Sequence, residues 1–196
     1  MEITVYPGAK ALIFDLDGTL SDSLQLHIEA WNKIADIYGF KFDPQIVYDL
    51  TGSPTIAFAR KIIDIYKIEA DPEEIVKIKQ RSFWDSAELL QPIEQVIEIV
   101  KEYHNILPMS VGTGACRKSA EVQLKTLQIY DYFDFIVTAD DVGNHKPAPD
   151  TFMKCARLMG VHPSECQVFE DGDLGIEAAK TAGMIITDVR PALKVL

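Results

Sequence analysis

Five short segments of this sequence are almost continuously apolar, and longer stretches with helical periodicity separate them. A strand with one solvated face alternates apolar and polar residues, whereas a strand covered on both faces of a parallel sheet does not. The pattern therefore predicts an α/β fold with a doubly wound, Rossmann-like parallel sheet of five strands. The predicted strands are Ala11–Phe14, Leu107–Val111, Phe135–Thr138, Gln167–Phe169 and Met184–Val189.

The interval between the first two predicted strands is much longer than a single crossover connection requires. Residues 22–90 show no convincing strand but several helical patterns, beginning with an apolar stripe from Leu24 to Tyr38 that ends at Gly39. Further helices are expected near residues 44–50, 54–66 and 72–88. We therefore predict an α/β core of residues 1–21 and 91–196, with an inserted α-helical cap of residues 22–90.

Charge and cysteine usage exclude several classes of function. With 30 acidic and 19 basic residues, a formal net charge of −11, the chain is poorly suited to nucleic acid or to an anionic membrane surface. The three cysteines, Cys116, Cys155 and Cys166, are widely spaced, which is typical of reduced thiols rather than a disulfide framework. No signal peptide or membrane-length apolar run is visible, so we expect a cytoplasmic protein and, by default, a monomer.

Two acidic motifs follow predicted strands. Asp15 and Asp17 stand in the segment Asp15–Leu20, and Glu170 and Asp171 follow the strand that ends at Phe169. Ligands of open α/β sheets bind at the carboxyl ends of the strands, and acids gathered there repel one another unless a cation separates them. Hard oxygen ligands suit Mg²⁺, so the motifs predict a magnesium site. The alternative is a pair of ordinary acidic turns on the surface.

Two further motifs suit a bound phosphate. Thr113 lies between Gly112 and Gly114, where a hydroxyl and closely spaced backbone N–H groups can bind an oxyanion. Lys146 is followed by Pro147 in a turn that also holds a second proline, which predicts a localised positive charge in an acidic protein. Taken singly, a glycine-rich turn and an exposed lysine are both common without any function.

These four elements, in this order, resemble the haloacid dehalogenase-like superfamily of phosphotransfer enzymes over nearly the whole chain. The helical insert after the first strand resembles that of the β-phosphoglucomutase-like subgroup. The segments Val111–Gly114 and His145–Phe152 are similar to those of bacterial fructose-1-phosphate phosphatases. The resemblance implies a sheet order of 5-4-1-2-3, which places Asp15 beside Asp171.

The resemblance also implies a mechanism. Asp15 would be the nucleophile that forms an aspartyl-phosphate, and Asp17 would be the general acid and then the general base. Mg²⁺ would be held by the Asp15 carboxylate, the Asp17 backbone carbonyl and Asp171, with Glu170 close by through water.

The substrate would be a small sugar phosphate. The resemblance assigns its phosphoryl oxygens to Thr113, the Gly114 N–H and Lys146.

One departure bears on the choice between a phosphatase and a mutase. The mutase relatives hold a distal phosphate with an arginine and a lysine on the cap, and these positions fall at Thr55 and about Ser82 here, although Lys79 and Arg81 lie nearby. The missing charges favour hydrolysis, with a β-phosphoglucomutase-type mutase as the alternative. His27 stands ten residues after Asp17, where the mutase relatives carry a histidine that helps to position the acid/base aspartate.

Two other classes stay open on the residues alone. A metal-free dehalogenase would use Asp15 but would need neither Asp17 nor the acids at 170 and 171. A regulatory module without catalytic activity is disfavoured, because the complete set of motif residues is present.

Overall fold

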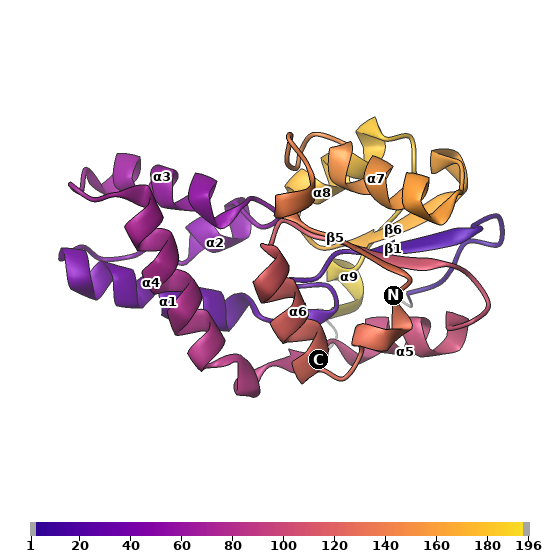
Figure 1. Cartoon of the computed structure of the whole chain (residues 1–196), viewed down its shortest axis with the longest axis horizontal. Helices are drawn as coiled ribbons and strands as arrows, with labels where there is room; N and C mark the ends of the chain where they lie inside the picture. Colours follow the sequence, from indigo (N-terminus) through magenta and orange to yellow (C-terminus); the bar gives the residue numbers. More distant parts are fainter. Residues whose placement is uncertain (1–2, 194–196) are drawn as a thin grey trace.

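The computed structural model describes residues 3–193 and contains one five-stranded parallel sheet (Figure 1). Its order is β5-β4-β1-β6-β7. When these five strands are numbered 1 to 5 along the chain and read from the β7 edge, the order is 5-4-1-2-3, as predicted. The predicted strands at Leu107 and Met184 begin before the observed ones. The strands are β1 (Ala11–Phe14), β4 (Met109–Gly112), β5 (Phe135–Val137), β6 (Cys166–Glu170) and β7 (Ile185–Asp188).

The strands at the centre of the sheet are the most deeply buried. Every residue of β1, β4 and β6 is buried, whereas the edge strands β5 and β7 are partly exposed. Phe14 at the end of β1 stacks on Phe169 of the neighbouring strand, with ring centroids 4.7 Å apart. The residue that follows β1 therefore emerges from the middle of a rigid, fully covered sheet.

Helices cover both faces of the sheet, as the doubly wound prediction requires. In Figure 1, α5 (Glu94–Tyr103), α6 (Arg117–Thr126) and α9 (Arg190–Leu193) lie below the sheet. The helices α7 (Asp150–Met159) and α8 (Asp173–Thr181) lie above it. Each layer has its own apolar cluster against the strands. Packing on both faces explains why the strands are apolar throughout rather than alternating.

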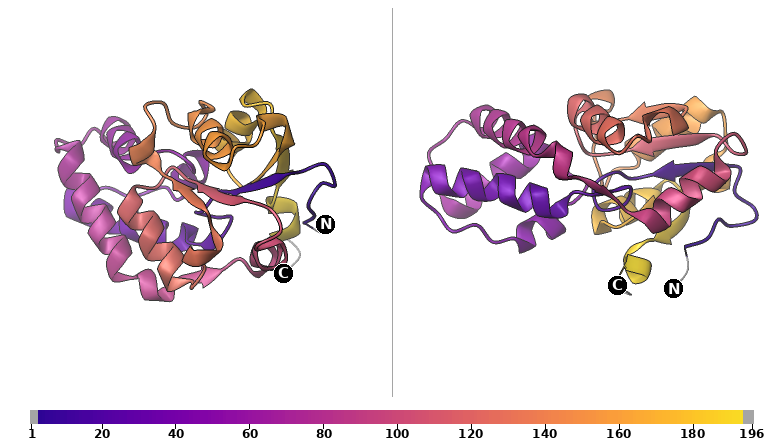
Figure 2. Two further views of the ribbon diagram at one scale, coloured as in Figure 1. Left: turned by 45° about the vertical axis from the view of Figure 1, so that its right-hand side comes forward. Right: turned by 90° about the horizontal axis from the view of Figure 1, so that it is seen from below.

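Four helices between β1 and β4 form a separate helical region. They are α1 (Leu24–Tyr38), α2 (Gln45–Asp49), α3 (Thr55–Tyr66) and α4 (Pro72–Asp85), followed by the 3₁₀ helix η1 (Ala87–Leu89). Figure 2 shows this region beside the sheet rather than on either face. Its apolar cluster includes Trp31, which stacks on Phe58 at a centroid distance of 4.6 Å. The predicted helices are present, although the last divides into α4 and η1.

A short strand pair joins the helical region to the sheet. β2 (Ser21–Asp22) and β3 (Gln91–Pro92) pair antiparallel, which brings the two connections together, as we expect of such an insertion. No strand is predicted at either position, because two residues are too few to show any periodicity. The strand pair fixes where the helical region attaches, directly after the segment Asp15–Leu20.

The remaining elements are short. Three further 3₁₀ helices are η2 (Tyr130–Tyr132), η3 (Ala139–Asp141) and η4 (Pro163–Glu165). All three cysteines are free, as predicted. Among residues 3–193, no helix has both the length and the apolar character needed to cross a bilayer.

The packing of the helical region predicts a large cost for removing its central aromatic side chain. Trp31 is 1% exposed, so we expect Trp31→Ala to lower the free energy of unfolding by about 3–5 kcal/mol. Equilibrium unfolding in urea measures this loss. Ile37→Ala on the same helix is the control, because Ile37 is 58% exposed and should change the stability by less than about 0.5 kcal/mol. Equal effects of the two substitutions would contradict the assigned packing.

Candidate active site

Two acidic motifs emerge side by side at the carboxyl edge of the sheet. Asp15 follows the last residue of β1, and Asp171 follows Glu170 at the end of β6. Because Phe14 pairs with Phe169 in the parallel register, the residues after them lie next to each other. Carboxylate oxygens of Asp15, Glu170 and Asp171 all lie within 4.8 Å of one another. The structure thus brings together the two acid motifs that the sequence places at strand ends.

Lys146 lies against these acids. Its Nζ donates to Asp15 Oδ1 and to Glu170 Oε2, both at 2.6 Å, and the residue is 4% exposed. The peptide bond between Lys146 and Pro147 is cis. Burial lowers the pKa of Lys146, but the charges of Asp15 and Glu170 outweigh burial and raise this pKa above its ordinary value. Lys146 is therefore a fixed positive charge beside Asp15.

The acidic cluster carries more negative charge than one lysine neutralises. Burial, and after it the charge of Glu170, raises the pKa of Asp15 well above its ordinary value. The same two causes raise the pKa of Asp171 to about 7. Asp15 Oδ2 is buried without a hydrogen-bond partner. Crowded carboxylates with an unpartnered oxygen are a hard, anionic donor set, so these residues fit a divalent metal ion such as Mg²⁺.

Two residues of the first motif shape the space around Asp171. Thr19 donates from Oγ1 to Asp171 Oδ1 at 2.8 Å. Gly18 has a φ of +87°, and a Cβ built there would lie 2.2 Å from Asp171 Oδ2. Only glycine adopts this backbone conformation readily and also leaves room for the carboxylate. Gly18 therefore allows both the sharp turn of the backbone and the close approach of the Asp171 carboxylate.

Asp17 turns away from the acidic cluster and is held by three donors. Ser23 Oγ, His27 Nε2 and Gln123 Nε2 lie 2.6, 2.8 and 2.9 Å from Asp17 Oδ1. Burial alone would raise the pKa of the Asp17 carboxyl, but the attraction of His27 and the three hydrogen bonds lower it well below its ordinary value. Asp15 and Asp17, two residues apart, thus have pKa values shifted in opposite directions.

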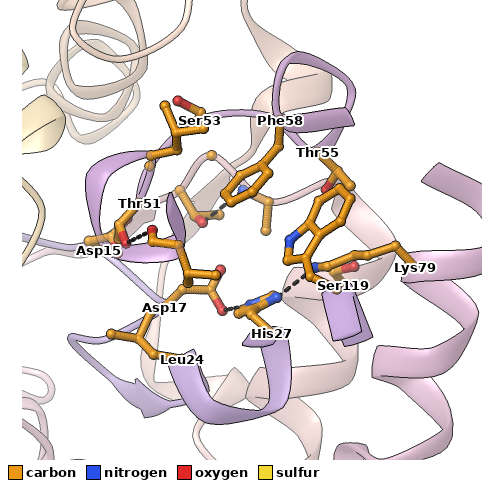
Figure 3. A pocket seen from close by; sticks show the side chains of 17 residues that line it. Asp15, Asp17, Leu24, His27, Thr51, Ser53, Thr55, Phe58, Lys79 and Ser119 are labelled. Atoms are coloured by element: carbon orange, nitrogen blue, oxygen red, sulfur yellow. Dashed lines mark hydrogen bonds and ion pairs between the residues drawn. The ribbon is translucent and has the colours of Figure 1, made fainter. Parts of the chain in front are cut away.

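His27 connects Asp17 to a buried lysine of the helical region. Figure 3 shows the ring of His27 between Asp17 and Lys79, and the distance from Lys79 Nζ to His27 Nδ1 is 2.6 Å. Burial, and after it the charge of Lys79, lowers the pKa of His27 below its ordinary value. The lowered pKa favours the neutral ring, in which Nδ1 accepts from Lys79 and Nε2 donates to Asp17.

A cleft of about 600 Å³, its open mouth included, lies between the sheet and the helical region. Figure 3 shows Asp15, Asp17 and Phe58 around it, and Trp31 of the helical region also lines it. A Cβ on Gly114 would lie 2.1 Å from the carbonyl oxygen of Gly52, so the two regions meet closely here. The other lining residues are Leu24, His27, Val47, Leu50, Thr51, Gly52, Ser53, Thr55, Lys79, Thr113, Gly114, Ala115 and Ser119.

The structure separates the predicted site residues into two groups. Asp15, Asp17, His27, Thr113 and Gly114 line the cleft. The other three predicted residues, Lys146, Glu170 and Asp171, do not line it but gather around Asp15. Asp15 and Glu170 hold the amine of Lys146, and its contact with the phosphoryl oxygens stays a prediction.

Glu170 is also more fully bound than the sequence predicts. Its Oε2 accepts from Lys146, and its Oε1 accepts from the backbone N–H groups of Asp171 and Gly172 at 3.1 and 2.9 Å. Asp173, a further acid in the same segment, has a side chain 87% exposed and pairs with Arg190.

Sequence reasoning missed several contacts of the site residues. Ser23 and Gln123 bind Asp17, and Thr19 binds Asp171. Lys79, considered from the sequence only as a distal phosphate ligand, contacts His27. The one available signal is a large polar residue on the buried face of a helix, which describes Gln123 beside Ala120, Leu124 and the smaller Ser119.

Comparison with known proteins is consistent with this geometry. The model of the haloacid dehalogenase-like hydrolase family matches residues 12–189. The chain belongs to this family. Its motifs and helical insertion place it in the β-phosphoglucomutase-like subgroup, and it is a phosphatase, a phosphoric monoester hydrolase.

Three relatives illustrate the similarity. The chain is 43% identical over 188 residues to the fructose-1-phosphate phosphatase YqaB of Escherichia coli, covering 95% of this chain and 99% of that protein. It is 30% identical to a phosphorylated carbohydrates phosphatase of Thermotoga maritima, over 89% of this chain and 82% of the relative. The crystal structure of β-phosphoglucomutase from Clostridium difficile superposes with a TM-score of 0.80 at 27% identity, covering 95% and 88% of the two chains.

The raised pKa of Asp171 predicts how stability depends on pH when a chelator removes divalent cations. The folded protein holds this proton up to about pH 7, whereas the ordinary value is 3.8, so ionising Asp171 favours the unfolded state. Stability should therefore fall as the pH rises from about 4 to about 7, and Asp171→Asn should reduce the fall. Thermal unfolding with a chelator measures both.

The exposed acid Asp173 supplies the matched control for this measurement. Asp173→Asn removes a carboxylate two residues away, outside the buried cluster, and should leave the fall in stability between about pH 4 and about pH 7 unchanged. A profile of Asp171→Asn identical to that of the unmodified protein would contradict the assigned charge crowding.

Proposed function

We propose that this protein is a Mg²⁺-dependent phosphatase that hydrolyses a small sugar phosphate, such as fructose 1-phosphate, through an aspartyl-phosphate. The observation that carries the proposal is the different environment of two aspartates in one motif. Asp15 lies beside Lys146 with one oxygen unpartnered, and Asp17 faces the same cleft with its carboxylate fixed by donors. A nucleophile and a proton carrier on either side of one phosphorus are what this reaction needs.

In the proposed first step, Asp15 is the nucleophile. A carboxylate oxygen of Asp15 forms a bond to phosphorus as the bond from phosphorus to the sugar oxygen breaks. Lys146 holds the other oxygen at 2.6 Å, which orients the carboxylate and offsets its charge. Asp15, Asp171, the Asp17 carbonyl and, through water, Glu170 would hold Mg²⁺, which would neutralise charge on the transferring phosphoryl group.

Asp17 is the proposed proton carrier in both steps. It gives a proton to the departing sugar oxygen, and it then accepts one from the water that attacks the aspartyl-phosphate. The hydrogen bonds from Ser23 and His27 stabilise its ionised form, which suits the second of these roles. Thr113 and the Gly114 N–H line the cleft next to the nucleophile, where we assign them to the phosphoryl oxygens.

The walls of the cleft suit a monosaccharide ester. The cleft is lined by the hydroxyl residues Thr51, Ser53 and Thr55 and by the aromatic residues Trp31 and Phe58. The relatives named for fructose 1-phosphate and for phosphorylated carbohydrates support this substrate class.

The basic residues of the cleft favour hydrolysis over a mutase reaction. Among the described residues that line it, Lys79 is the only lysine or arginine, and its amine lies 2.6 Å from His27. Arg81 is exposed on α4 and does not line the cleft. A mutase needs a clamp for a second phosphate, and Thr55 at the corresponding position is uncharged. Transfer of the phosphoryl group to water is therefore the favoured outcome.

We also propose that the helical region acts as a cap domain of residues 22–90 on a core of residues 1–21 and 91–196. Three observations support this division: the separate apolar cluster around Trp31, the strand pair at the junction, and the close approach of Gly52 to Gly114. A cap in this position would exclude bulk water from the reacting phosphate.

The central test of the proposal is a phosphate-release assay with Mg²⁺ on fructose 1-phosphate, glucose phosphates, 6-phosphogluconate and nucleotides. We expect release from a sugar phosphate, and we expect Asp15→Asn to reduce it by at least about 10³-fold because the covalent route is lost. The exposed Asp22 gives the matched control, Asp22→Asn, which should retain activity. Full activity in Asp15→Asn would refute the nucleophile, and isomerised product without free phosphate would identify a mutase.

Metal dependence is a separate expectation. Chelation should lower turnover by at least about 10²-fold, because the crowded carboxylates then repel an anionic substrate without compensation. Added Mg²⁺ should restore the rate, and sodium chloride at equal ionic strength should not. Undiminished turnover after complete chelation would contradict the metal assignment.

A further inference from the structure

Gln123 contacts Asp17 from a distant part of the chain. It lies on α6, is fully buried, and donates from Nε2 to Asp17 Oδ1 at 2.9 Å across 106 positions of sequence. It is not among the residues that line the cleft. Its side chain therefore reaches Asp17 from behind, away from where a substrate would bind.

The three donors to the Asp17 carboxylate all bind the same one of its two oxygens. Ser23, His27 and Gln123 all bind Oδ1, and among residues 3–193 no hydrogen bond reaches Oδ2. An amide nitrogen can only donate, so Oδ1 cannot carry a proton toward Gln123. A proton on Asp17 is therefore directed to Oδ2, the oxygen left for the cleft.

The environment of Gln123 indicates that stability alone does not explain it. Its Oε1 is buried with no hydrogen-bond partner, a costly arrangement that a leucine of similar size would avoid. Its buried neighbours on α6 are the apolar Ala120 and Leu124 and the small Ser119, whose hydroxyl is bonded to Trp84 and Cys116 rather than to Gln123. The side-chain hydrogen bond to Asp17 accounts for a glutamine at this position despite the unpartnered Oε1.

We propose that Gln123 is a positioning residue that fixes the Asp17 carboxylate with Oδ2 toward the substrate. This inference rests on the proposed function, because it assigns Asp17 the transfer of a proton from Oδ2 to the departing sugar oxygen. Ser23 and His27 hold Asp17 from the start of α1, whereas Gln123 holds it from a helix packed on the sheet. Gln123 thereby ties the proton carrier to the same framework as Asp15.

The test compares two esters that differ in their need for a proton. A sugar alkoxide must be protonated as it leaves, whereas p-nitrophenolate leaves without help. For Gln123→Leu we expect kcat/KM to fall about tenfold for the preferred sugar phosphate and less than about twofold for p-nitrophenyl phosphate. Because Gln123 does not line the cleft, the loss should be in kcat, with KM unchanged.

Two further variants separate positioning from folding. Gln123→Met keeps the length of the side chain but removes the donor, so it should show the same selective loss. Gln167→Leu is the matched control: Gln167 is also buried, and it binds the Thr4 carbonyl and Thr187 Oγ1 rather than Asp17. It should leave the ratio of the two kcat/KM values unchanged. If Gln123→Leu does not fold, Gln123→Met supplies the ratio.

An unchanged ratio in both Gln123 variants, whether through equal loss on both esters or none, would overturn the inference. That result leaves the proposed function intact, provided the unmodified protein hydrolyses the sugar phosphate and Asp15→Asn does not. Failure of the proposed function is different: the unmodified protein would then release phosphate from neither ester, and the inference would fall with it.

Discussion

The crowding of three buried carboxylates around one lysine is the constraint on which the rest of the site depends. Asp15, Glu170 and Asp171 meet because β1 and β6 are neighbours in register, and Lys146 is held between two of them. The chain leaves room for these oxygens with glycines. A Cβ on Gly175 would lie 1.8 Å from Glu170 Oε2, and one on Gly18 would lie 2.2 Å from Asp171 Oδ2. The lack of a side chain at these two glycines thus lets the carboxylates gather at one edge of the sheet.

Such a cluster costs folding free energy, and the rest of the fold offsets it. Buried like charges disfavour one another, which is why the pKa values of Asp15 and Asp171 are raised. The site is carried by the most rigid part of the molecule, the fully buried central strands with the stacked rings of Phe14 and Phe169. The formal net charge of −11 describes the whole chain. At the site, three carboxylates lie close to one fixed cation, Lys146, and their oxygens could also hold a metal ion.

Local pattern was sufficient for the sheet and for the acids at its edge. Continuous apolar runs identified the five strands and put both acid motifs at strand ends, whereas the strand order that places Asp15 beside Asp171 came from the family resemblance. Apart from the contact of Ser23, six residues after Asp17, the missed contacts depend on tertiary structure: Gln123 meets Asp17 across 106 positions, and Lys79 meets His27 across 52. Periodicity shows that such a residue faces inward, but not what it touches. The position of Lys146 behind the nucleophile likewise depends on how its loop crosses the sheet edge.

The opposite pKa shifts of Asp15 and Asp17 raise a question about the proposed reaction, because a general acid needs a proton that the donors around Asp17 disfavour. The charge of the substrate supplies an answer. A phosphate dianion in the cleft would raise the pKa of Asp17, while a metal ion beside Asp15 would lower the pKa of that carboxyl. Binding would thus bring each aspartate toward the protonation state its step requires. Once the sugar has left, the donors on Oδ1 again favour the ionised Asp17, which is the form that activates water.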